Sequence, residues 1–242
     1  MTAFMPMMRI RHPVLVIFCL IFAVTLYAED EILFREDFAD LANWEPLIFP
    51  EISRHTTYFI EKQDDTTVLV ADSNDGASAL VYRQTFDISS YSTLHWRWKV
   101  DRVYSKGDYR QKSGDDYPLR VYVMFEYAPE NASVGQRISY GLAKAIYGRY
   151  PPHSSLNYIW ANRDEETEPV FSPYTDRSIM IPLESGSKKV GRWVDETVNM
   201  REDYGKAFGE NPPAKASLAI MNDSDNTGEH ATAYIQFIEV RK

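Results

Sequence analysis

The residues of this sequence that are best suited to chemistry lie in two short acidic segments, each next to a strand-like run. Residues 114–116 (GDD) come directly before one such run, and residues 222–228 (NDSDNTG) come before the last run of the chain. Oxygen-bearing side chains at this density suit a hard cation, a sugar hydroxyl or a demanding turn. The candidate binding residues in these segments are Asp115, Asp116, Asp223, Asp225 and Asn226.

The second acidic segment begins like a calcium-binding loop. Asp223 and Asp225 stand where an EF-hand loop has its first and third ligands, and Gly228 takes the place of the loop glycine, so these two aspartates are candidate calcium ligands. The twelfth position is Tyr234 instead of a bidentate glutamate, which excludes an EF-hand. Two interpretations stay open: a calcium site completed by residues from elsewhere, and a turn whose side chains cap its own backbone amides.

The first acidic segment has a cationic neighbour, Arg120, four residues after Asp116. We expect one of the two aspartates to pair with Arg120 in a partly buried salt bridge, and Arg120 is itself a candidate binding residue. If the two acidic segments converge in space, their carboxylates need a cation, a shared proton or basic partners. The candidate basic partners are Arg97, Lys99 and Arg120.

Paired carboxylates raise the question of catalysis. A glycosidase needs two carboxyl groups about 5–5.5 Å apart for retention or about 6.5–9.5 Å apart for inversion, and a sequence does not supply such a distance. A polysaccharide lyase needs a Tyr or His base near an Arg, and His95, Tyr109 and Arg110 supply those residue types. The sequence has no histidine pair with zinc-site spacing, no nucleophile elbow and no Gly-rich phosphate loop.

The N-terminus has the layout of a secretory signal peptide. Arg9 and Arg11 form a basic region, residues 14–26 form a continuous apolar run, and Ala28 is a small residue suited to the cleavage position. The apolar run is shorter than the roughly 18–20 residues that span a bilayer, although an uncleaved membrane anchor is the alternative interpretation. We therefore predict a signal peptide over residues 1–28, a mature domain over 29–242 without a stable membrane span, and a periplasmic or secreted location.

Cleavage there would leave an acidic chain without cysteine. The only cysteine, Cys19, lies in the predicted signal peptide, so the mature domain would depend on its core and not on disulfides. Loss of Arg9 and Arg11 would change the formal charge from −9 to −11. Such a domain is a poor partner for nucleic acid or anionic lipid, and it suits a neutral glycan, a cation or a protein partner. The expected partner is a glycan or another component of the cell envelope.

Alternation of apolar and polar residues predicts strands along most of the mature chain, most clearly over residues 94–100 and 119–127. Regular spacing with turn residues between the runs predicts a mainly β fold, a single antiparallel β-sandwich of the jelly-roll type. Helix-like spacing over residues 138–147 and 193–208 predicts two short helical insertions. Further strands are expected over residues 156–161, 177–183, 216–221 and 231–240.

Aromatic residues make up 14% of the chain, which suits both a sandwich core and a surface that stacks on sugars. Trp96 and Trp98 alternate in phase with Leu94 and Val100, so we expect both tryptophans in the core. The aromatic residues expected at the surface are Tyr109, Tyr117, Tyr147, Tyr150, Tyr158 and Trp160, and of these Tyr158 and Trp160 are candidate binding residues.

A set of motifs spread over the chain resembles a known family. The motifs are 96–100 (WRWKV), 114–116 (GDD), 120–123 (RVYV), 156–160 (LNYIW), 192–193 (RW), Asn199, 203–204 (DY), 208–209 (FG), 212–213 (PP), 219–221 (AIM) and 223–228 (DSDNTG). Together they resemble DUF3047, a domain-of-unknown-function family of exported bacterial proteins, over nearly all of the mature chain. The resemblance implies a single exported β-rich domain and brings no activity. The predicted fold also resembles the jelly-roll modules that bind polysaccharides.

These observations support three functional hypotheses. The first is an exported module that binds a glycan without catalysis, with or without a structural calcium ion. The second is a carbohydrate-active enzyme, a glycoside hydrolase or a polysaccharide lyase, that uses the acidic segments. The third is an envelope scaffold that binds another protein. Convergence of the two acidic segments in an open cleft, beside His95 or a tyrosine, favours the enzyme.

Overall fold

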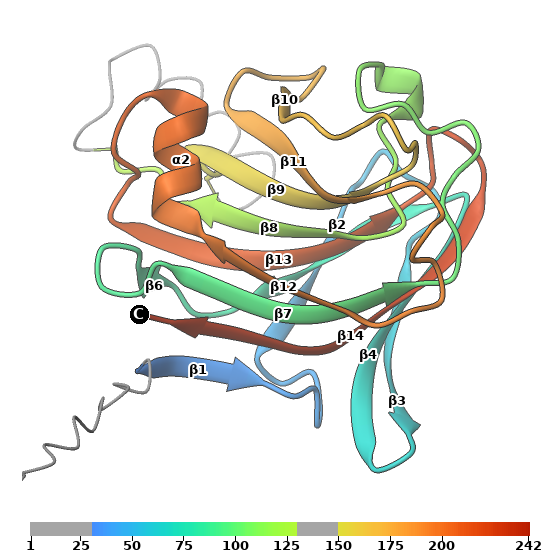
Figure 1. The fold of residues 1–242 in the computed structure, drawn as a ribbon, viewed down its shortest axis with the longest axis horizontal. Helices are drawn as coiled ribbons and strands as arrows, with labels where there is room; N and C mark the ends of the chain where they lie inside the picture. The colour runs from blue at the N-terminus through green and yellow to red at the C-terminus, as the bar shows by residue number, and fades with distance from the viewer. Residues whose placement is uncertain (1–30, 130–149) are drawn as a thin grey trace, which may run out of the picture.

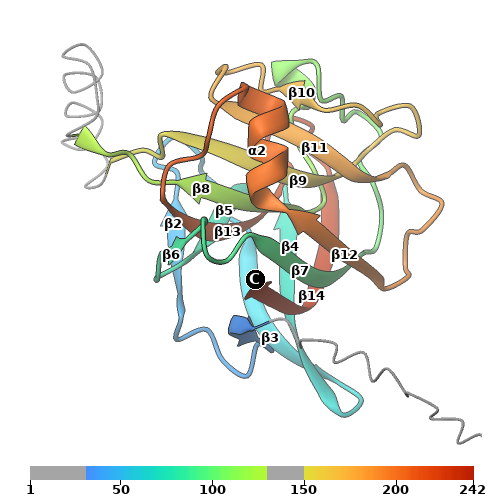
Figure 2. The ribbon, with the colours of Figure 1, turned by 60° about the vertical axis from the view of Figure 1, so that its left-hand side comes forward.

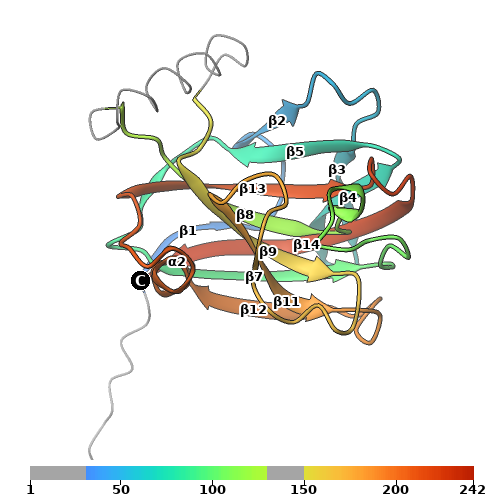
Figure 3. The same cartoon turned by 90° about the horizontal axis from the view of Figure 1, so that it is seen from above.

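The computed structural model describes residues 31–129 and 150–242, and it places them in two β-sheets that pack face to face (Figure 1, Figure 3). The expected β-sandwich is confirmed, and buried apolar side chains from both sheets form its core. The predicted signal peptide and the helix expected over 138–147 lie outside the described residues. Within the described residues, no helix is long and apolar enough to cross a membrane.

Sheet A is antiparallel throughout. Its strands are β1 (Ile32–Glu36), β3 (Thr57–Gln63), β4 (Thr66–Asn74), β7 (Thr93–Val100), β12 (Val194–Asn199) and β14 (His230–Arg241). They are arranged in the order β12-β7-β14-β4-β3, and β1 also pairs with β14. The long strand β14 therefore lies in the middle of the sheet, between β7 and β4.

Sheet B carries the acidic segments at one end of its strands. Its strands are β2 (Trp44–Ile48), β5 (Ala77–Tyr82), β6 (Phe86–Asp87), β8 (Arg120–Phe125), β9 (Ser154–Ala161), β10 (Val170–Phe171), β11 (Ser178–Ser185) and β13 (Lys215–Asp223). The order is β10-β11-β9-β8-β13-β5-β2, with β6 beside β13. The pair β9 and β11 is parallel, which departs from the expected antiparallel pattern. A short 3-10 helix, η1 (Lys112–Gly114), precedes β8.

The prediction of a helix over residues 193–208 is correct only for its second part. Val194–Asn199 forms the edge strand β12, and Met200–Phe208 forms the helix α2 beside it (Figure 2). The sequence pattern fits both structures, because two valines four positions apart share one face in a strand as well as in a helix. Asn199 marks the boundary, since its side chain accepts hydrogen bonds from two backbone N–H groups of the first helical turn (3.1 and 3.0 Å).

Aromatic rings from both sheets meet in the centre of the sandwich. Trp96 and Trp98 of β7 are fully buried, as expected, and pack edge to face with 5.3 Å between their ring centroids. Across the core, Trp96 packs against Tyr158 (5.6 Å) and Trp98 against Trp160 (5.8 Å), both on β9. Each such ring pair contributes about 0.5–1.5 kcal/mol beyond its buried area, so these contacts fix how the two sheets pack.

For four aromatic side chains, the prediction that they lie at the surface is wrong. All four are at most 1% exposed, and none can stack on a sugar: Tyr109, Tyr117, Tyr158 and Trp160. Tyr158 and Trp160 point into the core between the two sheets, whereas Tyr109 and Tyr117 belong to a second apolar cluster that covers the outer face of β9. Of the remaining two candidates, Tyr150 is 37% exposed, and Tyr147 lies outside the described residues.

Two glutamates interact at an open edge of the sandwich, where β12 of sheet A approaches β11 of sheet B. Glu196 of β12 accepts a hydrogen bond from Trp98 Nε1 (3.3 Å), and Glu184 of β11 pairs with Lys189 (2.5 Å). Burial, and then the negative charge of Glu184, raise the pKa of Glu196 to about 7. Near neutral pH, this edge therefore changes its charge.

We predict that Glu196→Gln makes the stability of the protein less dependent on pH. Because folding raises the pKa of Glu196, its ionisation lowers the stability of the wild type as pH rises from about 4.5 to about 7. Urea unfolding should give similar free energies for wild type and variant near pH 4, and a more stable variant at pH 8. The same difference at both pH values would contradict this prediction.

Candidate functional site

A pocket of about 780 Å³ lies on the outer face of sheet B, the face that points away from the sandwich core. Strand alternation defines this face: Val121 and Ile220 point into the core, whereas Arg120 and Met221 line the pocket. We call this cavity the outer pocket. Its floor is formed by small and apolar side chains of β5, β8 and β13: Ala77, Val81, Met124, Ser217 and Met221.

Loops form the walls of the outer pocket. Residues 47–52 line one side, and residues 150–152 lie near the end of β8. Tyr174 stands at the opposite end, where its hydroxyl donates a hydrogen bond to the backbone carbonyl of Lys112 (3.2 Å). Most of the polar lining residues gather at this same end, at the start of β8 and the end of β13: Asp115, Arg120, Asp223, Asp225 and Asn226.

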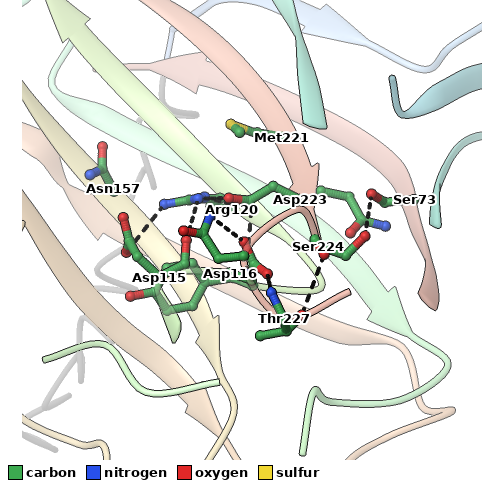
Figure 4. Close-up of polar contacts among 12 residues, drawn as sticks. Ser73, Asp115, Asp116, Arg120, Asn157, Met221, Asp223, Ser224 and Thr227 are labelled. Carbon is green, nitrogen blue, oxygen red and sulfur yellow. Dashed lines mark hydrogen bonds and ion pairs between the residues drawn. The ribbon is translucent and has the colours of Figure 1, made fainter. Parts of the chain in front are cut away.

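Arg120 is the centre of this polar end (Figure 4). Its Nε donates a hydrogen bond to Asp223 Oδ1 (2.9 Å), and its Nη2 contacts the other oxygen of the same carboxylate. Nη2 also donates to the backbone carbonyl of Asp115 (3.0 Å), and Nη1 lies 3.7 Å from Asp115 Oδ1. The ring of Tyr117 packs 4.6 Å from the guanidinium carbon. The expected pairing of the first acidic segment with Arg120 is therefore confirmed.

The two acidic segments meet in space. β8 and β13 are antiparallel neighbours with Arg120 opposite Met221, so the start of β8 lies beside the end of β13. Asp116 accepts hydrogen bonds from the backbone N–H of Thr227 (2.6 Å) and from Asn226 Nδ2 (3.1 Å). As a result, three carboxylates come together, and one oxygen of each lies within 4.8 Å of the other two: Asp116, Asp223 and Asp225.

Buried polar side chains fix the shape of the second acidic segment, and sequence reasoning missed them. Asn222 donates to two backbone carbonyls of sheet A, in β4 and β14 (2.8 and 2.9 Å), and accepts a hydrogen bond from the Tyr104 hydroxyl (2.7 Å). Ser224 Oγ is hydrogen-bonded to Ser73 Oγ of β4 (2.9 Å, Figure 4). These contacts anchor the end of β13 to the opposite sheet. In the sequence, the sign of these contacts was the asparagine and the serine that lie among the aspartates.

Burial shifts two carboxyl groups of the outer pocket toward the protonated form. It is the main cause of the raised pKa of Asp115, which the charge of Arg120 partly opposes. Burial also raises the pKa of Asp225, and repulsion from Asp116 adds to the effect. Three buried oxygens around Arg120 (Figure 4) have no hydrogen-bond partner within the described residues: Asp115 Oδ1, the Tyr117 hydroxyl and Asn157 Oδ1.

Two of the basic residues expected beside the carboxylates lie elsewhere. Arg97 and Lys99 alternate with the core tryptophans along β7, so they lie on the outer face of sheet A, across the sandwich from the outer pocket. His95 shares that face for the same reason. Arg120 is thus the predicted basic partner that the structure places beside the acidic segments.

The architecture and the cavity define a β-sandwich domain of the jelly-roll type with a pocket on the outer face of one sheet. The chain belongs to the family described as protein of unknown function DUF3047, whose model matches residues 42–239. The resemblance carried by the sequence motifs is therefore confirmed. No curated protein matches the sequence.

Several solved structures have a similar arrangement of strands, but their sequence identity to this chain is low. A protein of unknown function with a galectin-like fold from Bacillus subtilis has a TM-score of 0.47 and 11% identity, covering 88% of this chain and 97% of that chain. The family 11 carbohydrate-binding module of a Clostridium thermocellum cellulase has a TM-score of 0.40 and 9% identity, covering 88% and 95%. Endoglucanase 3 of family GH12 from Trichoderma harzianum has a TM-score of 0.41 and 10% identity, covering 76% and 84%. At this distance, the similarities carry no argument about what this chain binds.

We predict that Arg120→Met lowers the free energy of unfolding by about 3–5 kcal/mol, because it leaves the Asp223 carboxylate buried without its partner charge. Urea denaturation measures the loss. The double variant Arg120→Met/Asp223→Leu removes both charges and should recover most of the stability, since apolar replacements of a buried ion pair are often neutral. A double variant as unstable as the single one would show that the ion pair does not account for the effect.

Proposed function

We propose that this protein is an exported domain that binds a carbohydrate in the outer pocket without converting it. The observation that supports this proposal is the lining of the pocket, where apolar and aromatic walls end at a cluster of planar polar side chains. A sugar presents apolar ring faces and hydroxyl groups, so it matches both kinds of surface. The volume of about 780 Å³ falls within the usual range of small-ligand sites, about 300–1,000 Å³.

The described lining of the outer pocket includes four aromatic side chains: Phe49, Phe125, Tyr150 and Tyr174. Tyr174 is 56% exposed, and Tyr150 is also exposed, so both rings are accessible to a ligand. At the polar end, Asp115, Asp225 and Asn226 provide oxygens that accept hydrogen bonds from hydroxyl groups. A short oligosaccharide that lies along β8 and β13 would contact both the rings and these oxygens.

Convergence of the acidic segments, with Tyr117 close by, is the observation that favours the enzyme hypothesis. A glycosidase, however, needs a protonated acid beside an ionised partner, so the pKa values of its two carboxyl groups are pushed apart. In the outer pocket, Asp115 and Asp225 have raised pKa values and suit the role of the acid. The ionised partner, however, would have to be Asp116 or Asp223, and Asp116 already accepts two hydrogen bonds from the second acidic segment. Asp223, the third lining aspartate, has both oxygens in contact with Arg120. These features support binding over hydrolysis.

The scaffold hypothesis has less support. It requires a large exposed apolar patch without a cleft. Of the exposed large apolar side chains in the described residues, Ile48, Tyr150 and Tyr174 line the cavity, and the others are spread over β1, β3 and β10. A ligand smaller than a protein fits that arrangement better.

We predict that Tyr174→Ala weakens oligosaccharide binding about 2- to 10-fold, which corresponds to the loss of one aromatic contact of about 0.5–1.5 kcal/mol. Isothermal titration calorimetry against a panel of neutral and amino-sugar oligosaccharides measures the affinity. Phe59→Ala, which removes an exposed ring on sheet A, should leave binding unchanged. The wild type should release no reducing ends from any panel member. A panel without a single ligand would contradict the proposal, and released reducing ends would favour the enzyme.

Export to the periplasm or the medium is part of this proposal and rests on the signal-like residues 1–28. N-terminal sequencing of the protein recovered from those fractions checks it. The mature chain should begin close to Glu29, and a chain that keeps its leader would contradict cleavage and favour the membrane anchor.

A structural calcium ion at Asp223 and Asp225 is a hypothesis based on the sequence. The structure adds Asp116, so that three carboxylates could each offer one oxygen to a cation. The oxygens of Asp223 are already in contact with Arg120, and Asp116 already accepts two hydrogen bonds from the second acidic segment. A calcium ion would have to compete with these donors.

We therefore predict that the fold does not depend on calcium. Melting temperatures in excess EDTA and in millimolar calcium should agree within about 1 °C, because a cation at 100 times its Kd would add about 2.7 kcal/mol and shift the midpoint by several degrees. Magnesium serves as the control for ionic strength. A rise that is specific to calcium and is lost in Asp225→Asn would instead place a calcium ion at the three carboxylates.

A further inference from the structure

We infer that the ligand of the outer pocket carries a protonated primary amine, as a deacetylated amino sugar does, and that Asp115 and Asp225 bind this ammonium group. The inference rests on the proposed carbohydrate function and names the class of sugar. Three features of the pocket support it: its excess of negative charge, an oxygen of Asp115 that accepts no hydrogen bond within the described residues, and Asp225, which forms no ion pair with a described side chain.

The lining of the outer pocket is strongly acidic. Among the described lining residues the one basic side chain is Arg120, which is buried, and the nitrogen atoms of its guanidinium already contact Asp223 and Asp115. Arg120 therefore has little to offer an anionic ligand, and acidic polysaccharides meet like charge here. The acidic lining residues are Glu51, Asp115, Glu126, Asp223 and Asp225. A cationic ligand is electrostatically complementary to this surface.

Asp115 presents a buried oxygen to the outer pocket. The residue is 7% exposed and lines the pocket, and its Oδ1 accepts no hydrogen bond within the described residues. The nearest charge, Arg120 Nη1, is 3.7 Å away, which is beyond hydrogen-bonding distance. A buried carboxylate oxygen without a donor is destabilising, so a ligand N–H at this position would complete the site.

Asp225 is the second acceptor. It is half-buried on the same pocket, and no side chain in the described part of the chain donates a hydrogen bond to it. Its carboxylate also lies close to those of Asp116 and Asp223. A cation bound here would offset the repulsion that the neighbouring carboxylates exert.

An ammonium group fits this site better than a metal ion or a hydroxyl group. It has three N–H donors and a full positive charge, so it can donate to more than one acceptor of the acidic lining. A calcium ion needs six to eight oxygen ligands, and two of the nearby carboxylates already have donors within the chain. A hydroxyl group donates one hydrogen bond and leaves the excess charge in place. The exposed ring of Tyr174 stands near this end, where it can contact the sugar that carries the amine.

The experiment compares three β-1,4-linked oligosaccharides of equal length by calorimetry: glucosamine, N-acetylglucosamine and glucose oligomers, at a pH at which the amine is protonated. The glucosamine oligomer should bind at least about tenfold more tightly than the other two, which is the size of one charge-assisted hydrogen bond. Asp225→Asn and Asp115→Asn should each reduce this preference to about 2-fold or less. Asp65→Asn removes an exposed carboxylate in the β3–β4 turn and should preserve it. Circular dichroism and thermal melting verify that the variants are folded.

The possible outcomes separate this inference from the proposed function. Equal or tighter binding of the neutral oligomers would overturn the ammonium site and leave carbohydrate binding intact. A preference for the amine that survives both variants would also overturn it. A simple diamine that binds as tightly as the glucosamine oligomer, and that loses affinity in Asp225→Asn, would support the ammonium site and contradict the carbohydrate proposal. Failure of every oligosaccharide and of the diamine would overturn both.

Discussion

One buried ion pair determines the geometry of the polar end of this protein. Arg120 begins β8 and Asp223 ends β13, and their contact joins two neighbouring strands at the edge where both acidic segments lie. A buried ion pair adds little net stability compared with apolar residues, but loss of one partner is costly. The pair therefore acts mainly as a constraint on structure. The position of Asp115, whose backbone carbonyl also accepts a hydrogen bond from Arg120, depends on it.

The same constraint explains the unusual electrostatics of the outer pocket. The guanidinium satisfies Asp223 almost completely, so the negative charge that remains belongs to the carboxylates around it. Internal hydrogen bonds satisfy Asp116, whereas Asp115 Oδ1 has none within the described residues. The chain thus leaves part of a polar network incomplete at the surface of a cavity. Incomplete networks of this kind are typical of binding sites, because the ligand supplies the missing partner.

Local features of the sequence predicted local structure well. Alternation along 94–100 placed Trp96 and Trp98 in the core, and the spacing of the first acidic segment predicted its contact with Arg120. Features that depend on distant partners were not predictable. Convergence of the acidic segments follows from the pairing of β8 with β13, and the burial of Tyr158 follows from packing against the opposite sheet. The split of 193–208 into strand and helix was ambiguous because four-residue spacing suits both periods.

The parallel pairing of β9 with β11 affects which part of the chain can vary within this family. Parallel strands cannot be joined by a tight turn, so the chain between them must make a long return. Buried Glu166 holds that return in place by accepting hydrogen bonds from the backbone N–H groups of Tyr109 (3.1 Å) and Asn162 (3.0 Å). Tyr174 follows β10 on this return, outside the strand ladder, and still lines the outer pocket. Substitutions or insertions around it can therefore alter the lining of the outer pocket while the registers of both sheets stay constant, which makes this connection a natural place for relatives to differ.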